Sequence, residues 1–345
     1  MNYSTFFSRT FTFTLICTLL FFILFTACAN DSNTTADTTI DNVVKVTAMH
    51  DHEENLHLFD MSTHEISSGW TTFEFTNASP VDHFFVIYHA PNEAVEAANN
   101  AGEPLLDHWF KSVTEPFQME FNPYVNGEID YGQFVDNLVA AIGEKGPWFF
   151  DPGAAPNGGP GFTAPGSTSK TTVFLEPGEY IVECYVKDEN EQFHSYLGML
   201  EHLTVAGSNS ETDVPNSTLN MTISSANGIQ SAETVSPGDH IIEILFEDQE
   251  TYGHLLGHNV QLVKLQDNSS QDILNELAAW MDWTQPGALV DRAPEGAEFI
   301  GGAMEMTEGS TAYFHVSLEP GNYAWIAEIP NPAEHGMLKV FEVDN

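Results

Sequence analysis

Alternating polar and apolar positions recur along most of this chain. Residues 71–76 (TTFEFT) and 170–175 (KTTVFL) alternate with a period of two, and a new apolar run begins at 180–182, after a Pro-Gly turn. This period is typical of strands that bury one face and expose the other. The pattern therefore predicts an all-β fold.

Two segments depart from this alternation and predict short helices. Residues 92–146 contain the helix-like stretches EAVEAANNAG and YGQFVDNLVAAIGEKG, and residues 271–283 (QDILNELAAWMDW) form an amphipathic pattern. Residues 153–166 are rich in Gly and Pro, which predicts a loop. We expect β-domains that carry short helical inserts.

The N-terminus has the pattern of an export signal. Arg9 precedes the apolar run 11–25, and Phe25-Thr26-Ala27-Cys28 resembles the end of a bacterial lipoprotein signal, with Phe25 where Leu is usual. The resemblance implies that residues 1–27 are cleaved off and that Cys28 carries a lipid. An ordinary cleaved signal and an uncleaved anchor are the alternatives, but the run is short for a spanning helix. We expect a tethered protein of the cell envelope, on the periplasmic or cell-surface side.

The remaining chain divides into two parts that repeat each other. Residues 28–42 are polar and predict a flexible tether, and the polar stretch 207–217 predicts a linker. Between and after them lie 43–206, with its helical insert at about 92–146, and 218–345. LEPGEY at 175–180 recurs as LEPGNY at 318–323, and GML at 198–200 recurs at 336–338. Two tandem copies of one β unit explain these repeats.

The charge balance restricts the possible partners. The sequence has 50 acidic and 9 basic residues, a net charge of −41. Nucleic acids and anionic membrane surfaces bind basic patches, so we expect neither, and membrane contact only through the N-terminal lipid. A salt-adapted exterior explains this charge, and docking to a basic partner is the alternative.

A single unpaired cysteine is the strongest chemical signal. Cys17 lies in the predicted signal, so a lipidated Cys28 leaves Cys184 as a lone thiol in an oxidising compartment. An inert buried thiol is one explanation. However, His83, His194 and Met199 offer the remaining donors of a soft-metal site, in which the thioether binds weakly along an axis.

Three segments in order resemble the cupredoxin family of plastocyanin-like blue-copper proteins. They are residues 68–77, which end in Asn77 six residues before His83; residues 177–184, which end in Cys184; and residues 194–205, in which His194 and Met199 precede a final strand. The resemblance implies two Greek-key β-sandwiches and one copper ion in the first. It also implies electron transfer to a redox partner protein, with no reaction catalysed.

The loop between the cysteine and the second histidine is longer than in most small blue-copper domains. If residues 189–190 form a two-residue hairpin loop, Cys184 pairs with Ser195 and His194 points to the other face. A loop with an odd number of residues places Cys184 and His194 on one face. The sequence leaves both registers open.

The second copy lacks the cysteine, since Ala327 stands in its place. Its possible donors are therefore only His254, His258, His335 and Met337. In multicopper oxidases, histidines flank the copper cysteine, whereas here Glu183 and Tyr185 do, which disfavours oxidase chemistry. Two alternatives to electron transfer remain: a metal-free interaction module, and a protein that captures or delivers copper.

Overall fold

The computed structural model describes residues 42–51, 56–209, 212–232, 234–266, 271–290 and 292–344, which belong to one compact unit. Most elements are strands, and the few helices are short, so the all-β prediction is confirmed. The predicted signal, Cys28 and nearly all of the tether lie outside the described residues. No helix in the described part is long and apolar enough to cross a membrane.

The first half of the unit is a sandwich of two sheets. Its strands are β1 (Val43–Asp51), β2 (Leu56–Met61), β3 (Glu65–Asn77), β4 (Val86–Ala90), β5 (Ala155–Pro156), β6 (Thr168–Leu175), β7 (Gly178–Glu183) and β8 (Leu200–Asn209). One sheet has the order β2-β1-β3-β6, and the other has the order β3-β8-β7-β4-β5. The long strand β3 belongs to both, and it changes partner at Gly69, where a φ of 125° requires glycine.

Aromatic side chains fill the space between these two sheets. Phe59 on β2 and Phe73 and Phe75 on β3 meet Phe85, which precedes β4, at ring-centroid distances of 5.2–5.7 Å. Every second side chain of β3 from Thr71 to Asn77 is buried, as the alternation predicts. The apolar face of β3 therefore forms the core on which both sheets depend.

The second half repeats the strand pairing of the first. Its strands are β9 (Leu219–Ser224), β10 (Gly228–Gln230), β11 (Gly238–Phe246), β12 (Val260–Leu265), β13 (Ala297–Ala303), β14 (Thr311–Leu318), β15 (Gly321–Ile326) and β16 (Leu338–Val343). β9 runs parallel to β11 as β1 does to β3, and β15 pairs with β12 and β16 as β7 does with β4 and β8. Antiparallel pairing of β6 with β14 joins the halves into one continuous sheet.

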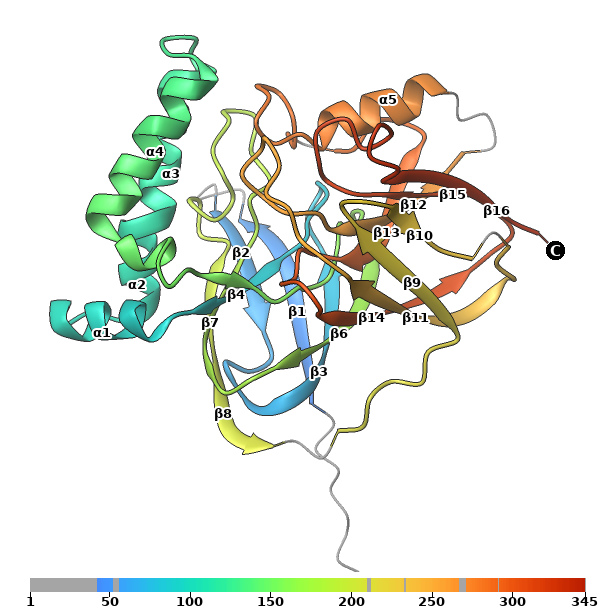
Figure 1. Cartoon of the computed structure of the whole chain (residues 1–345), viewed down its shortest axis with the longest axis horizontal. Coiled ribbons are helices and arrows are strands. Elements are labelled where there is room, and N and C mark those ends of the chain that lie inside the picture. Colours follow the sequence, from blue (N-terminus) through green and yellow to red (C-terminus); the bar gives the residue numbers. More distant parts are fainter. Residues whose placement is uncertain are drawn as a thin grey trace, which may run out of the picture. The chain divides into compact units, whose positions relative to one another are not determined.

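The predicted helical insert forms between β4 and β5. It consists of α1 (Asn92–Ala101), α2 (Leu105–Trp109), the π-helical turn η1 (Phe110–Thr114), α3 (Glu115–Val125), α4 (Tyr131–Lys145) and the 3-10 turn η2 (Pro147–Phe149). Asp130 caps α4 in a capping box with Gln133. Phe121 and Phe134 pack α3 against α4. These helices lie beside β4 and β7, while α5 (Gln271–Trp280) lies with the second half (Figure 1).

Three boundaries differ from the sequence-based predictions. β8 continues to Asn209 because it pairs with the first residues of β3, so a strand occupies the start of the predicted 207–217 linker. Met49 and His50 belong to β1 and pair with β2, in a stretch whose acidic and histidine residues 50–54 (HDHEE) gave no strand pattern. α5 ends at Trp280, three residues early.

Candidate metal centre

Three of the predicted donor residues meet at one end of the first sandwich. Nδ1 of His83 lies 3.6 Å from Sγ of Cys184 and 3.3 Å from Nδ1 of His194. All three residues are buried, with at most 1% of their surface exposed. Nε2 of both histidines is also buried and has no hydrogen-bond partner among the described residues. The structure thus gathers one sulfur and two nitrogens that are shielded from water.

The two distances from Nδ1 of His83 are those that a shared metal ion would produce. With bonds of about 2.05 Å to nitrogen and about 2.3 Å to sulfur, a tetrahedral centre separates two nitrogens by about 3.35 Å and nitrogen from sulfur by about 3.55 Å. The observed 3.3 and 3.6 Å match both values. In contrast, Nδ1 of His83 offers one proton or one lone pair, and so it fully satisfies only one of its two contacts.

The backbone around His83 is fixed by the neighbouring loop. Its N–H donates to the carbonyl of Thr163 (3.3 Å), and its carbonyl accepts from the N–H of Thr163 (2.7 Å). The buried amide of Asn77 donates to the carbonyls of Val81 and Thr163, at 2.7 Å each. Asn77 thus ties the end of β3 to both sides of the histidine.

The hairpin after Cys184 has the register that brings His194 inward. The N–H of Asp188 donates to the carbonyl of Gln192, so three residues form the loop, and Glu191 closes it with a φ of 61°. The N–H of His194 then donates to the carbonyl of Val186 (2.8 Å). Because Val186 and Cys184 share a face of the strand, the odd loop places His194 on the side of Cys184.

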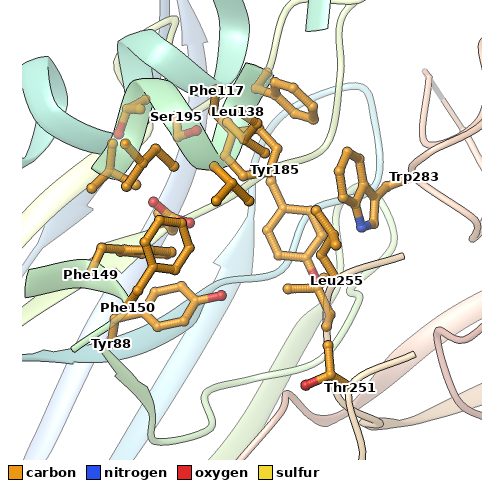
Figure 2. A pocket seen from close by; sticks show the side chains of 17 residues that line it. Tyr88, Phe117, Leu138, Phe149, Phe150, Tyr185, Ser195, Thr251, Leu255 and Trp283 are labelled. Atoms are coloured by element: carbon orange, nitrogen blue, oxygen red, sulfur yellow. The ribbon is translucent and has the colours of Figure 1, made fainter. Parts of the chain in front are cut away.

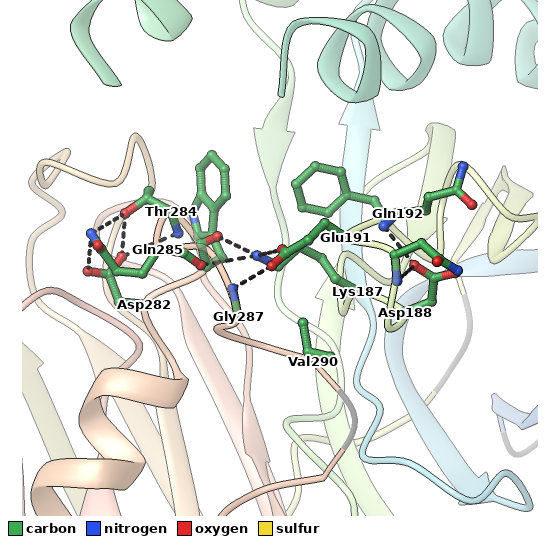
Figure 3. Close-up of polar contacts among 12 residues, drawn as sticks. Lys187, Asp188, Glu191, Gln192, Asp282, Thr284, Gln285, Gly287 and Val290 are labelled. Atoms are coloured by element: carbon green, nitrogen blue, oxygen red, sulfur yellow. Dashed lines mark hydrogen bonds and ion pairs between the residues drawn. The ribbon is translucent and has the colours of Figure 1, made fainter. Parts of the chain in front are cut away.

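A buried lysine anchors this hairpin to the second half of the unit (Figure 3). Nζ of Lys187 donates to the carbonyls of Trp283 and Gln285, at 3.2 Å each, and forms an ion pair with Glu191 at 2.6 Å. The same ammonium lies 4.8 Å from the ring centre of Phe121 on α3. The hairpin is therefore held from both the helical insert and the 283–285 loop.

Met199 lies at the end of the same loop. Its N–H donates to the carbonyl of His194 (2.8 Å), and its carbonyl accepts from the N–H of Cys184 (3.2 Å). The side chain is fully buried. These bonds close the segment between Cys184 and Met199 into a compact loop.

The sequence-based interpretation missed His57 on β2. Its ring stacks on His194 at a centroid distance of 3.7 Å and an angle of 13°, and His50 stacks on its other side at 4.3 Å. One nitrogen each of His57, His83 and His194 lie within 4.8 Å of one another. An imidazole binds metal in its ring plane, so an ion held by His194 lies off the plane of the parallel His57 ring. We therefore assign His57 as a wall of the site.

A sequence signal for His57 does exist. In the run 56–61 (LHLFDM), His57 is in phase with Phe59 and Met61, and all three are buried. A histidine on the apolar face of a strand has to be accommodated in the core. What covers it there depends on chain segments far away in the sequence.

Burial controls the protonation of the donors. It raises the pKa of the Cys184 thiol to about 12, although the N–H groups of Phe84 and Val186 act in the opposite direction. Burial also lowers the pKa of His83 and of His194 well below the usual range, and the neighbouring imidazoles add to this. Both histidines are hence neutral at neutral pH and able to bind metal, while the thiol needs a nearby cation to ionise.

The corresponding end of the second half has a different character. Ala327 takes the place of Cys184, and its N–H donates to the carbonyl of Met337 as that of Cys184 does to Met199. His258 contacts the hydroxyl of Tyr252 at 3.3 Å, and His254 contacts the carbonyl of Glu328 at 2.6 Å. Within the described residues, the second half holds no group of three His, Cys, Asp or Glu side chains whose donor atoms lie within 4.8 Å of one another; the one such group is His57, His83 and His194, which does not include Cys184.

Comparisons with known proteins return structures of copper proteins. No protein-family model matches the chain, and no curated protein matches its sequence. The chain is similar to auracyanin B, at 17% identity and a TM-score of 0.27, over 39% of this chain and 93% of that one. It is also similar to auracyanin A, a blue copper protein of Chloroflexus aurantiacus, at 15% identity and a TM-score of 0.24, over 48% of this chain and 98% of that one. A third similar structure is the blue copper oxidase of Nitrosomonas europaea, at 10% identity and a TM-score of 0.21, over 88% of this chain and 84% of that one. TM-scores this low carry no structural argument. The assignment of a β-sandwich therefore rests on the observed pairing of the strands.

Proposed function

We propose that this protein binds one copper ion through His83, Cys184, His194 and Met199 and works as an electron carrier. The observation that supports this most strongly is the pair of distances from Nδ1 of His83 to the sulfur of Cys184 and to Nδ1 of His194. A thiolate, two imidazoles and a weak thioether are the donors typical of blue-copper sites. Bound copper would supply one-electron oxidation and reduction.

The protein's own residues favour electron transfer over copper delivery. All four donor residues are at most 1% exposed, and the His57 ring covers His194. A carrier that hands on its metal needs an open site, whereas an electron carrier benefits from a site that excludes water and keeps its geometry. The hydrogen bonds of Asn77 and Lys187 fix two of the segments that carry the donors.

The wider setting belongs to the same proposal. The chain is exported, cleaved before Cys28 and held at the cell envelope by a lipid on that residue, with residues 28–42 as a tether. Two tandem cupredoxin-like domains follow, the second without a cysteine and with a structural role. The redox partner is a protein, and the protein catalyses no reaction of its own.

The test is metal loading of the purified mature chain followed by visible spectroscopy and metal analysis. We expect one copper per chain and an intense thiolate-to-copper absorption band. Both are lost in Cys184→Ser and in His83→Gln. His89→Gln is the matched control, because His89 lies on β4 outside the cluster and leaves band and stoichiometry unchanged.

The alternative is a metal-free module in which the cluster is held by hydrogen bonds. It predicts that copper-treated protein has no such band and that Cys184 still reacts with a thiol reagent after mild unfolding. That result would rule out the copper site. A band that survives Cys184→Ser would contradict the assignment of the sulfur.

A further inference from the structure

A cavity of about 370 Å³ lies beside Tyr185, just after the end of β7 (Figure 2). Three parts of the chain enclose it: the β4–β7 sheet, the helical insert, and loops of the second half. Its lining residues from the sheet side are Tyr88, Glu183, Tyr185, Phe193 and Ser195; from the insert Val113, Thr114, Phe117, Leu138, Val139, Ile142, Phe149 and Phe150; and from the second half Thr251, Leu255, Leu256 and Trp283.

Strand geometry separates this cavity from the metal centre. Cys184 faces the donor cluster, so its neighbours Glu183 and Tyr185 face the opposite way, into the cavity. Tyr88 pairs with Ile181 across β4 and β7 and shares that face. Val139 and Phe150 are each 48% exposed, which marks where the cavity opens to solvent.

The walls select an apolar, aromatic ligand. Most of the lining is aliphatic or aromatic, and Figure 2 shows Phe149, Phe150 and Tyr88 on one side and Trp283 and Leu255 on the other. A cavity of about 150 Å³ lined by apolar side chains takes up benzene. The larger volume here therefore has room for two fused rings, and it falls within the range of small-molecule sites.

The polar groups of the lining are one carboxyl and several hydroxyls, which suit an uncharged hydroxyl head group. No Lys, Arg, His, Asn or Gln is among the lining residues. The indole N–H of Trp283 already donates to the carbonyl of His254 (3.0 Å), and the hydroxyl of Tyr185 donates to Glu328 (2.9 Å). Glu183 carries the only carboxyl among the lining residues and offers acceptor oxygens, while the hydroxyls of Thr114, Ser195 and Thr251 can donate or accept.

We propose that this cavity binds a small neutral aromatic alcohol, whose hydroxyl donates a hydrogen bond to Glu183. The site is independent of copper, because none of its lining residues is a proposed metal ligand. It gives the helical insert a role in recognition, since eight of the lining residues come from that segment.

The test is calorimetric titration of the metal-free, full-length mature protein with three matched naphthalenes at neutral pH. We expect 2-naphthol to bind. Its methyl ether, which cannot donate, should bind about 3- to 10-fold more weakly, the value of one hydrogen bond between neutral groups. 2-Naphthoate should bind more weakly still, because no cationic side chain lines the cavity to compensate its buried charge. Failure of copper binding would leave these results unaffected.

Two variants locate the ligand. Glu183→Leu should bind the alcohol and the methyl ether equally, and Leu138→Trp should fill the cavity and abolish binding. Val340→Trp is the matched control, since Val340 lies exposed on β16, and it should bind as the parent protein does. No binding of 2-naphthol, equal binding of alcohol and ether by the parent protein, or undiminished binding by Leu138→Trp would overturn the proposal.

Discussion

Glu328 makes the stability of this protein depend on pH in a direction that can be calculated. The residue follows β15 and is fully buried. Its Oε2 accepts from the hydroxyl of Tyr185 (2.9 Å) and from the amide of Asn259 (3.1 Å), while Oε1 has no hydrogen-bond partner among the described residues. Burial raises the pKa of this carboxyl to about 8, although both hydrogen bonds act to lower it.

The sign follows from comparing the folded and unfolded chains. The pKa is about 8 when folded and near 4.5 when unfolded, so the folded state holds the proton more tightly. The resulting stabilisation is fully present below pH 4.5 and is lost as the pH rises through 8. The difference between the two pKa values is equivalent to at most about 5 kcal/mol in the free energy of unfolding. This corresponds to about 1.4 kcal/mol for each pH unit between them.

Glu328→Gln removes this titration and keeps the shape of the side chain. Urea unfolding of both proteins from pH 5 to pH 9 gives the stability difference at each pH. We expect wild type to lose up to about 1.4 kcal/mol per pH step relative to the variant between pH 5 and 8. Effects of Glu183 and Glu305, whose pKa values burial raises to about 7, are present in both proteins and largely cancel.

The control is Glu334→Gln, which changes an exposed carboxyl and should leave the pH dependence of stability as in wild type. A stability difference between wild type and Glu328→Gln that stays constant across this pH range would refute the reasoning. It would mean that Glu328 titrates alike in the folded and unfolded chains.

Three further predictions concern the framework of the site. Lys187→Met leaves Oε2 of Glu191 and two carbonyls without their donor, and should destabilise the fold by about 3–5 kcal/mol in thermal or urea unfolding; an unchanged midpoint would contradict the anchoring role. His57→Ala uncovers one side of His194, and should speed the reaction of Cys184 with a thiol reagent in the metal-free protein, whereas an equal rate would argue against a covering role. Gly159→Ala places a Cβ 2.2 Å from the carbonyl oxygen of Phe85 at a φ of 133°, and should prevent stable folding, as circular dichroism would reveal.

Sequence alone predicted the β-fold and named three residues that the structure brings together, His83, Cys184 and His194. The alternation at 71–76 fixes which side chains of β3 face the core, because a period of two is a local property of the backbone. The positions of Asn77, His83, Cys184 and His194 could also be recognised in the sequence, because each lies next to a segment with the pattern of a strand or a turn.

Only the tertiary structure decided how these residues meet. The three-residue loop that closes at Glu191 determines the face of His194, and it is stabilised by Lys187 through carbonyls almost a hundred residues away. The stacking of His57 on His194 and the cavity behind Glu183 likewise join segments distant in sequence. Such contacts depend on the packing of whole sheets and helices, which no local pattern of polar and apolar residues encodes.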